Sequence, residues 1–139
     1  MSTTALHWLP EPRLREVYRE LATVLRPGAV FLNGDHLSVD DTSPALGRLE
    51  RAVHERQEAR RFESGRPEDW RQWWEAIAAD PALAEAEMLR AERSEAAAHN
   101  GSESGELSTH TAALRDAGFG EIGTLWQRGH DRLLCAIRL

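Results

Sequence analysis

Three residues near the start of the chain carry side chains that could do chemistry. Imidazole as a chemical group titrates near neutral pH, so His7 could act as a general base or bind a substrate. Asp35 and His36 follow an apolar segment that predicts a strand, and ligands of open α/β sheets bind at the carboxyl ends of strands. We therefore take all three as candidate catalytic residues. For His7, a structural role with hydrogen bonds to backbone groups stays open as the alternative.

An acidic segment follows His36. Asp40 and Asp41 lie close to Asp35 and His36 in the sequence, and carboxylate oxygens with an imidazole could bind a divalent cation. Acid-rich loops are more often simply solvated. We therefore expect no metal site here.

Four tryptophans are candidate substrate contacts. Trp8 follows His7 directly, and Trp70, Trp73 and Trp74 fall on one face of a predicted helix, where they could line a pocket for an aromatic or apolar substrate. Tryptophans at such positions also pack into protein cores. The sequence leaves both interpretations open for each of the four.

A helix and a strand are expected to position the first candidates. Apolar residues recur at i, i+3, i+4 and i+7 over residues 13–25, which predicts an amphipathic helix. Pro27 and Gly28 end it, and the apolar run at residues 29–32 predicts a short strand buried on both faces. Because residues 36–43 are polar, we expect a loop to leave the carboxyl end of this strand.

The middle of the chain is predicted to be helical. Helices are expected at residues 44–62, from Pro67 onward, and from Asp80 to about residue 99. They form a three-helix insertion over residues 44–99. The composition of residues 100–105 predicts a loop.

The end of the chain predicts a last helix and a β-hairpin. Ser108 is expected to cap the helix and Gly118 to end it. Strands are predicted at residues 121–128 and 133–137, antiparallel because their link is too short to cross a sheet. The second is apolar without alternation, as in an interior strand. We expect one α/β domain that spans the whole chain.

Composition excludes several classes of protein. A net charge of -6, with basic and acidic residues interleaved, argues against a nucleic-acid partner. No apolar run approaches the roughly 20 residues of a membrane helix, and the start lacks the basic residues of a signal peptide. We expect a cytoplasmic protein without a membrane partner. A single cysteine, Cys135, excludes an internal disulfide and a multi-cysteine zinc site.

Three segments, in this order, resemble class I S-adenosylmethionine-dependent methyltransferases. The first is Ser-Thr-Thr-Ala-Leu-His-Trp-Leu-Pro at residues 2–10, followed by a helix with Tyr-Arg-Glu-Leu and Val-Leu-Arg-Pro-Gly and a strand ending in Gly34-Asp35. It resembles the exit of that family's fourth strand, the next helix and the fifth strand. Leu-Arg-Asp-Ala-Gly-Phe at residues 114–119 and Leu-Leu-Cys-Ala-Ile at residues 133–137 resemble its last helix and closing antiparallel hairpin.

The resemblance implies a fold, a cofactor and a substrate class. The fold is α/β, a partial Rossmann-like methyltransferase sheet with one parallel strand and a C-terminal antiparallel hairpin. The cofactor is S-adenosylmethionine, and the acceptor is a small molecule that the helical insertion covers as a lid. The residues that would border the cofactor, mainly through backbone groups, are Thr3, Thr4, Ala5, Leu6 and His7.

The sequence departs from that family at its front. No Gly-x-Gly pattern followed by a helix occurs in it, and that turn builds much of the family's cofactor site. We therefore expect the C-terminal half of the fold, with weak cofactor binding by this chain alone. It could be a fragment, or a chain completed by an N-terminal half or a homodimer partner. It could also be a remnant that kept the second half of the fold for a non-enzymatic role. The alternative function is a non-catalytic helical interaction or dimerisation module.

Overall fold

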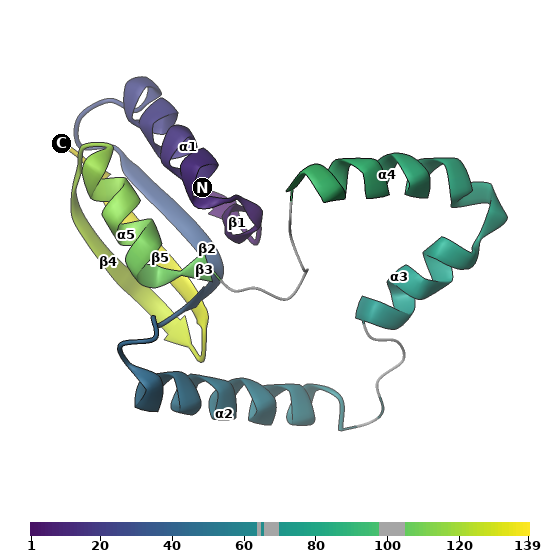
Figure 1. Ribbon diagram of the computed structural model, residues 1–139. Helices are drawn as coiled ribbons and strands as arrows, with labels where there is room; N and C mark the ends of the chain where they lie inside the picture. Colours follow the sequence, from purple (N-terminus) through teal and green to yellow (C-terminus); the bar gives the residue numbers. More distant parts are fainter. Residues whose placement is uncertain (64, 66–69, 98–104) are drawn as a thin grey trace. The chain divides into compact units, whose positions relative to one another are not determined.

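The computed structural model describes residues 1–63, 65, 70–97 and 105–139, apart from the side chains of residues 70, 71, 74 and 91–97. The chain divides into two compact units (Figure 1). The first comprises Met1–Arg56 with Gly101–Leu139, and the second comprises Gln57–Asn100. The first unit holds the sheet and every candidate catalytic residue.

The first unit is built on a mixed sheet in the order β1-β2-β5-β4. Its strands are β1 (Ser2–Thr3), β2 (Val30–Ser38), β4 (Phe119–Arg128) and β5 (Asp131–Arg138), and β3 (Gly105–Glu106) also pairs with β2. β1 and β3 run parallel to β2, whereas β5 runs antiparallel to both β2 and β4. This confirms a mixed α/β chain in which the first strand region and the closing hairpin share one sheet, with the last strand inside it.

β2 is longer than predicted, and it is not buried on both faces. The loop predicted to begin at His36 begins later, because His36, Leu37 and Ser38 still belong to the strand. His36 pairs with β5, while Leu37 and Ser38 pair with β3. Burial alternates along β2: one face is buried and the other only partly covered. The prediction failed because backbone partners from distant segments, rather than apolar side chains, extend this strand.

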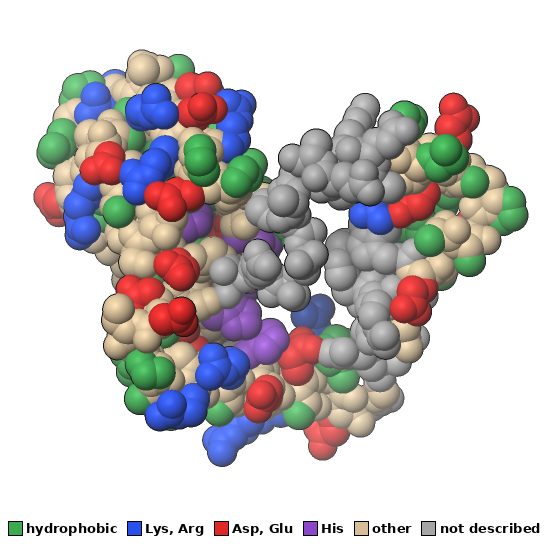
Figure 2. Space-filling view, viewed as in Figure 1, with side chains coloured by type: hydrophobic (Ala, Val, Ile, Leu, Met, Phe, Trp, Pro, Cys, Tyr) green, Lys and Arg blue, Asp and Glu red, His purple; other side chains and the backbone are tan. Residues whose placement is uncertain are grey.

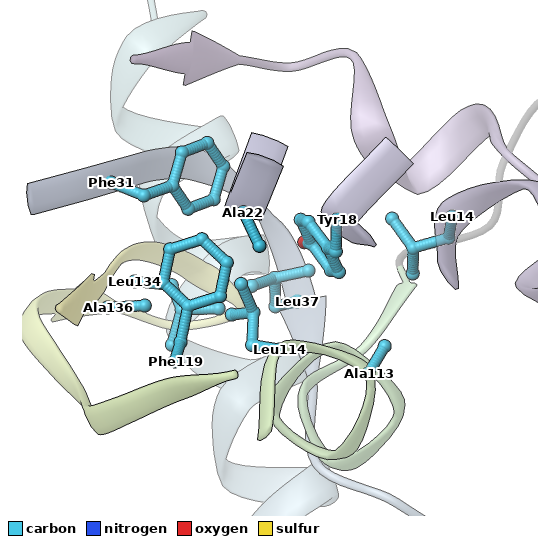
Figure 3. Packing of buried hydrophobic residues seen from close by; sticks show 10 residues of the cluster. All are labelled: Leu14, Tyr18, Ala22, Phe31, Leu37, Ala113, Leu114, Phe119, Leu134 and Ala136. Atoms are coloured by element: carbon cyan, nitrogen blue, oxygen red, sulfur yellow. The ribbon is translucent and has the colours of Figure 1, made fainter. Parts of the chain in front are cut away.

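Two helices cover the buried face of the sheet. α1 (Glu11–Val24) and α5 (Leu107–Asp116) contact each other and supply Leu14, Tyr18, Ala113 and Leu114 to one core. Figure 3 shows these side chains meeting Phe31, Leu37, Phe119, Leu134 and Ala136 of the strands. The amphipathic pattern predicted for α1 is confirmed: its apolar stripe faces the sheet. A short 3-10 helix, η1 (Leu6–Trp8), precedes α1.

The end of α5 follows the prediction and its start does not. Gly118 has φ +92°, the left-handed conformation that glycine adopts readily, and Phe119 behind it is buried. At the start, the N-cap residue is Glu106 and not Ser108, which lies within the helix. The backbone of Gly105–Glu106 pairs with β2, and the helix begins directly after this strand, at Leu107.

The insertion is helical, as predicted. α2 (Pro44–Arg61) begins in the first unit, and α3 (Trp70–Ala79), η2 (Pro81–Leu83) and α4 (Ala84–Ala97) belong to the second. Asp80 caps η2 by accepting a hydrogen bond from the Ala82 amide at 2.9 Å. Among the described residues, none of the helices has both the length and the apolar character needed to span a membrane.

Candidate functional site

A buried carboxylate lies at the centre of the candidate site. Asp35 is 3% exposed, on the buried face of β2. Its Oδ2 accepts hydrogen bonds from the amides of Leu6 and His7, both at 3.2 Å, and from Asn33 Nδ2 at 3.4 Å. Its Oδ1 accepts from the amide of His36 at 3.0 Å. Donors from three segments of the chain thus meet at one buried carboxylate.

The same carboxylate holds the imidazole of His7. His7 Nδ1 lies 2.5 Å from Asp35 Oδ1, and only 6% of the histidine side chain is exposed. Because an ionised carboxylate can only accept, Nδ1 donates, and the lone pair of a neutral His7 is then on Nε2. This is the arrangement of a histidine general base that a carboxylate orients. Trp8 lies against it, with ring centroids 4.6 Å apart.

The segment predicted to border the cofactor lies beside the middle of β2. Thr3 pairs with Gly34, and the Thr4 amide donates to the Gly34 carbonyl at 2.8 Å. Thr4 has φ +46°, a conformation that side chains other than glycine rarely adopt. Ala5 then begins the turn into η1. Strained backbone of this kind gathers at functional sites, which supports a role for this strand exit.

Histidines from distant segments gather next to this pair (Figure 2). His36 Nδ1 lies 2.6 Å from Asp131 Oδ1, and His130 Nε2 lies 3.8 Å from the same oxygen. The ring of His36 is 5.5 Å from that of His7 and 5.4 Å from that of His130, and the His54 ring is 4.4 Å from that of His130. β2, the β4–β5 turn, α2 and η1 thus each contribute an imidazole.

A cavity of about 260 Å³ opens at the same end of the sheet. It lies past the carboxyl end of β1 and beside Gly34, Asp35 and His36 within β2. Open α/β sheets bind ligands at the carboxyl ends of their strands. Both polar and apolar residues line it: Thr4, Gly34, Asp35, His36, Trp126, Asp131, Arg132 and Leu133. The cavity can hold a small molecule within reach of the His36–Asp131 pair.

A buried ion pair supports this end of the sheet. Arg132 Nη2 donates to Glu50 Oε1, and both residues are more than 90% buried. The Val39 amide and Gln127 Nε2 also donate to Glu50, each at 3.2 Å. Arg132 is the β5 residue directly opposite Asp35. The pair therefore ties α2 to the strands that carry the candidate site.

A second buried polar pair lies between α1 and α5. The Tyr18 hydroxyl is 2.6 Å from His110 Nδ1, and both side chains are almost fully buried. Burial lowers the pKa of His110 to about 4, against an opposing contribution from Asp35. Burial also raises the pKa of Tyr18. Both groups are therefore neutral near pH 7, and the hydroxyl can donate to the imidazole.

Some predicted site residues fall elsewhere. Trp73 belongs to the second unit, where its side chain is 41% exposed, and the side chains of Trp70 and Trp74 lie outside the described residues. Asp40 is engaged with Thr42, whose amide donates to it at 3.1 Å. His36 is joined instead by Asp131, which is remote in the sequence.

Sequence reasoning missed several residues that form this site: His54, His130, Asp131, Arg132, Glu50 and Trp126. The segment Gly129-His130-Asp131 has the pattern of a turn between two strands and no other local signal. It lies opposite His36 because of the register of β5 against β2, which a local pattern does not specify.

The chain matches no protein-family model and no curated protein.

Proposed function

We propose that this chain is part of a class I S-adenosylmethionine-dependent methyltransferase that methylates a small molecule. The observation that carries the proposal is the His7–Asp35 pair, which lies just past the carboxyl end of β1 and within the second half of β2, with Asp35 lining a cavity. The strand order supports it, because the resemblance implies an antiparallel hairpin whose last strand lies inside the sheet, and β5 lies between β2 and β4.

Bound S-adenosylmethionine would supply an electrophilic methyl group on a sulfonium. The described residues fit one border of such a group: the backbone of Thr3 and Thr4 pairs with Gly34 of β2, and Thr4 lines the cavity. Asp35 holds His7 by its Nδ1 proton. Nε2 of His7 then takes the proton that an acceptor O–H or N–H loses as it is methylated.

The test is methyl transfer by the gene product that contains this chain, at the length its gene encodes. With S-adenosylmethionine labelled in the methyl group and a panel of small-molecule alcohols, phenols and amines, label should move to one class of acceptor. His7→Asn should lower kcat by about 100-fold or more, since positioned bases contribute about 10²–10⁴-fold.

Asp35→Asn should lower kcat in the same way, because an amide no longer fixes the donor role of His7 Nδ1. Asp116→Asn, a change at an exposed carboxylate outside the site, is the matched control and should keep full activity. A folded protein that transfers no label to any acceptor, or that is unaffected by His7→Asn, would contradict the proposal.

For the 139-residue chain by itself, we expect weak binding of S-adenosylmethionine. The amides of Leu6 and His7 already donate to Asp35, and that of Thr4 to Gly34, so these three are not free for a cofactor. Isothermal titration calorimetry should give a dissociation constant well above the micromolar range, on the order of millimolar or weaker. Micromolar binding would show that the described residues suffice.

The exposed apolar residues of the insertion favour a second candidate, an interaction module. Large apolar side chains are exposed along its helices: Leu46, Leu49, Val53, Trp73, Leu83, Met88 and Leu89. Exposed apolar side chains that gather into patches mark association sites in many proteins. Light scattering after size-exclusion chromatography tests this function. It is supported if the chain is a dimer and the double variant Leu49→Glu with Met88→Glu is a monomer. It is opposed if the wild-type chain is a monomer at all concentrations.

A further inference from the structure

The cluster of His36, His130 and Asp131 offers two imidazole nitrogens and a carboxylate oxygen within 4.8 Å of one another. His36 lies in β2, His130 in the β4–β5 turn and Asp131 at the start of β5, and each is partly exposed, so an ion can reach them. We propose that they bind a divalent transition-metal ion of the zinc type. The proposal is independent of methyl transfer.

The distances suit a metal after a small adjustment. Metal–ligand bonds of about 2.0–2.2 Å in a tetrahedral site place ligand atoms about 3.4 Å apart. His36 Nδ1 and Asp131 Oδ1 are closer than this, at 2.6 Å, and His130 Nε2 is slightly further from that oxygen, at 3.8 Å. An ion between them would replace the His36–Asp131 hydrogen bond and move these two side chains apart.

The ligand types select the metal. Imidazole suits zinc, cobalt, nickel and copper, whereas magnesium and calcium prefer sites built entirely from oxygen. The cluster supplies two imidazoles and one carboxylate, a mixture of ligands found in zinc sites.

The site would keep one coordination position for a ligand. Three protein ligands leave a fourth position on a tetrahedral ion, as in catalytic rather than structural zinc sites. Two of the three ligand residues, His36 and Asp131, also line the cavity of about 260 Å³. An oxygen atom of a small molecule in this cavity can therefore occupy that position and be polarised by the ion.

The test is titration of the untagged, chelator-treated full chain with ZnCl₂ and, separately, CoCl₂ and MgCl₂ at pH 7.5. Calorimetry should give one zinc ion per chain with a dissociation constant on the order of micromolar or tighter, and no detectable magnesium binding. The cobalt complex should show d–d absorption without a thiolate charge-transfer band, which excludes Cys135 as a ligand.

Single substitutions identify the ligands. His36→Ala, His130→Ala and Asp131→Asn should each weaken zinc binding by at least about tenfold while the circular dichroism spectrum stays that of the wild type. His54→Ala removes a histidine next to His130 that is outside the three-residue cluster, and it should change affinity by less than about threefold. Asp116→Asn, which removes an exposed carboxylate outside the cluster, is the control and should leave zinc affinity unchanged.

Three results would overturn the proposal. One is the absence of zinc binding by the wild-type chain. Another is binding that the His36, His130 and Asp131 substitutions leave unchanged. The third is an equal loss with His54→Ala, which would show that the histidines bind zinc by a different set of ligands.

Discussion

Glu50→Ala is expected to lower the free energy of unfolding by about 3–5 kcal/mol, the range measured when one partner of a buried ion pair is removed. Arg132 is 4% exposed, and its guanidinium would be left in the interior without a counter-ion. Among the described residues, its Nε and Nη1 have no hydrogen-bond partner even with Glu50 present. The Val39 amide and Gln127 would lose their acceptor as well.

Urea denaturation at pH 7, followed by circular dichroism, measures this loss. The matched control is Glu16→Ala, which removes a glutamate from an exposed ion pair with Arg13 on α1 and should change stability little, because solvent screens such pairs. A loss with Glu50→Ala no greater than with this control would show that the buried pair does not support the fold.

The double variant Glu50→Leu with Arg132→Met separates the charge from the packing. It removes both buried charges and fills their space with apolar groups, which in other proteins is often neutral or stabilising. We expect it to be more stable than Glu50→Ala alone. If it is not, the cost of Glu50→Ala comes from lost packing between α2 and the sheet and not from an unpaired cation.

The elements that the sequence predicts well are those whose pattern is local. The 3.6-residue spacing of Leu14, Tyr18 and their neighbours specifies α1 wherever the helix packs, and the apolar run at residues 133–137 specifies β5 as an interior strand. Gly118 ends α5 through its own backbone conformation. These signals need no knowledge of the rest of the chain.

The parts that could not be predicted depend on partners far away in the sequence. His36–Ser38 look like a loop because they are polar, yet β3 and β5 supply the backbone partners that make them a strand. Asp35 looks like an exposed acid, and the amides of Leu6 and His7, nearly thirty residues earlier, allow its burial. Neither the pairing of β2 with β3 and β5 nor the hydrogen bonds to Asp35 can be inferred from the residues next to them in the sequence.

The candidate site shows the same limit. Proximity in the sequence grouped His36 with Asp40 and Asp41, whereas the fold pairs it with Asp131, 95 positions later. Strand pairing brings the two together, because His36 and Asp131 are directly opposite in the register of β2 and β5. A shift of one residue would place Asp131 on the other face, and the hydrophobic pattern alone did not fix that register.

The stability of the chain is expected to fall as the pH drops from about 6.5 to 4, because of His110. Burial holds the pKa of this imidazole at about 4 in the folded chain, against an ordinary value of 6.5. The unfolded chain therefore binds a proton in this range that the folded chain does not. The stabilisation is complete above pH 6.5 and is lost as the pH falls toward 4.

The size of this effect follows from the difference in pKa. At about 1.4 kcal/mol per pH unit, the loss attributable to His110 approaches about 3 kcal/mol at pH 4. Of the charged groups that act on the imidazole, Asp35 favours its protonation and His7 opposes it, and both contribute less than burial. Protonation would also oblige His110 Nδ1 to donate, so the Tyr18 hydroxyl would lose its acceptor.

His110→Asn isolates this contribution, because the amide has no proton to gain in this range. Urea denaturation at pH 7, 6, 5 and 4 should show a shallower decline in the free energy of unfolding for this variant than for the wild type, whatever its stability at pH 7. Tyr18→Phe, which keeps the buried imidazole, should retain most of the decline. Equal declines in the wild type and His110→Asn would mean that other groups cause the acid sensitivity, and that His110 is protonated as readily in the folded chain as in the unfolded one.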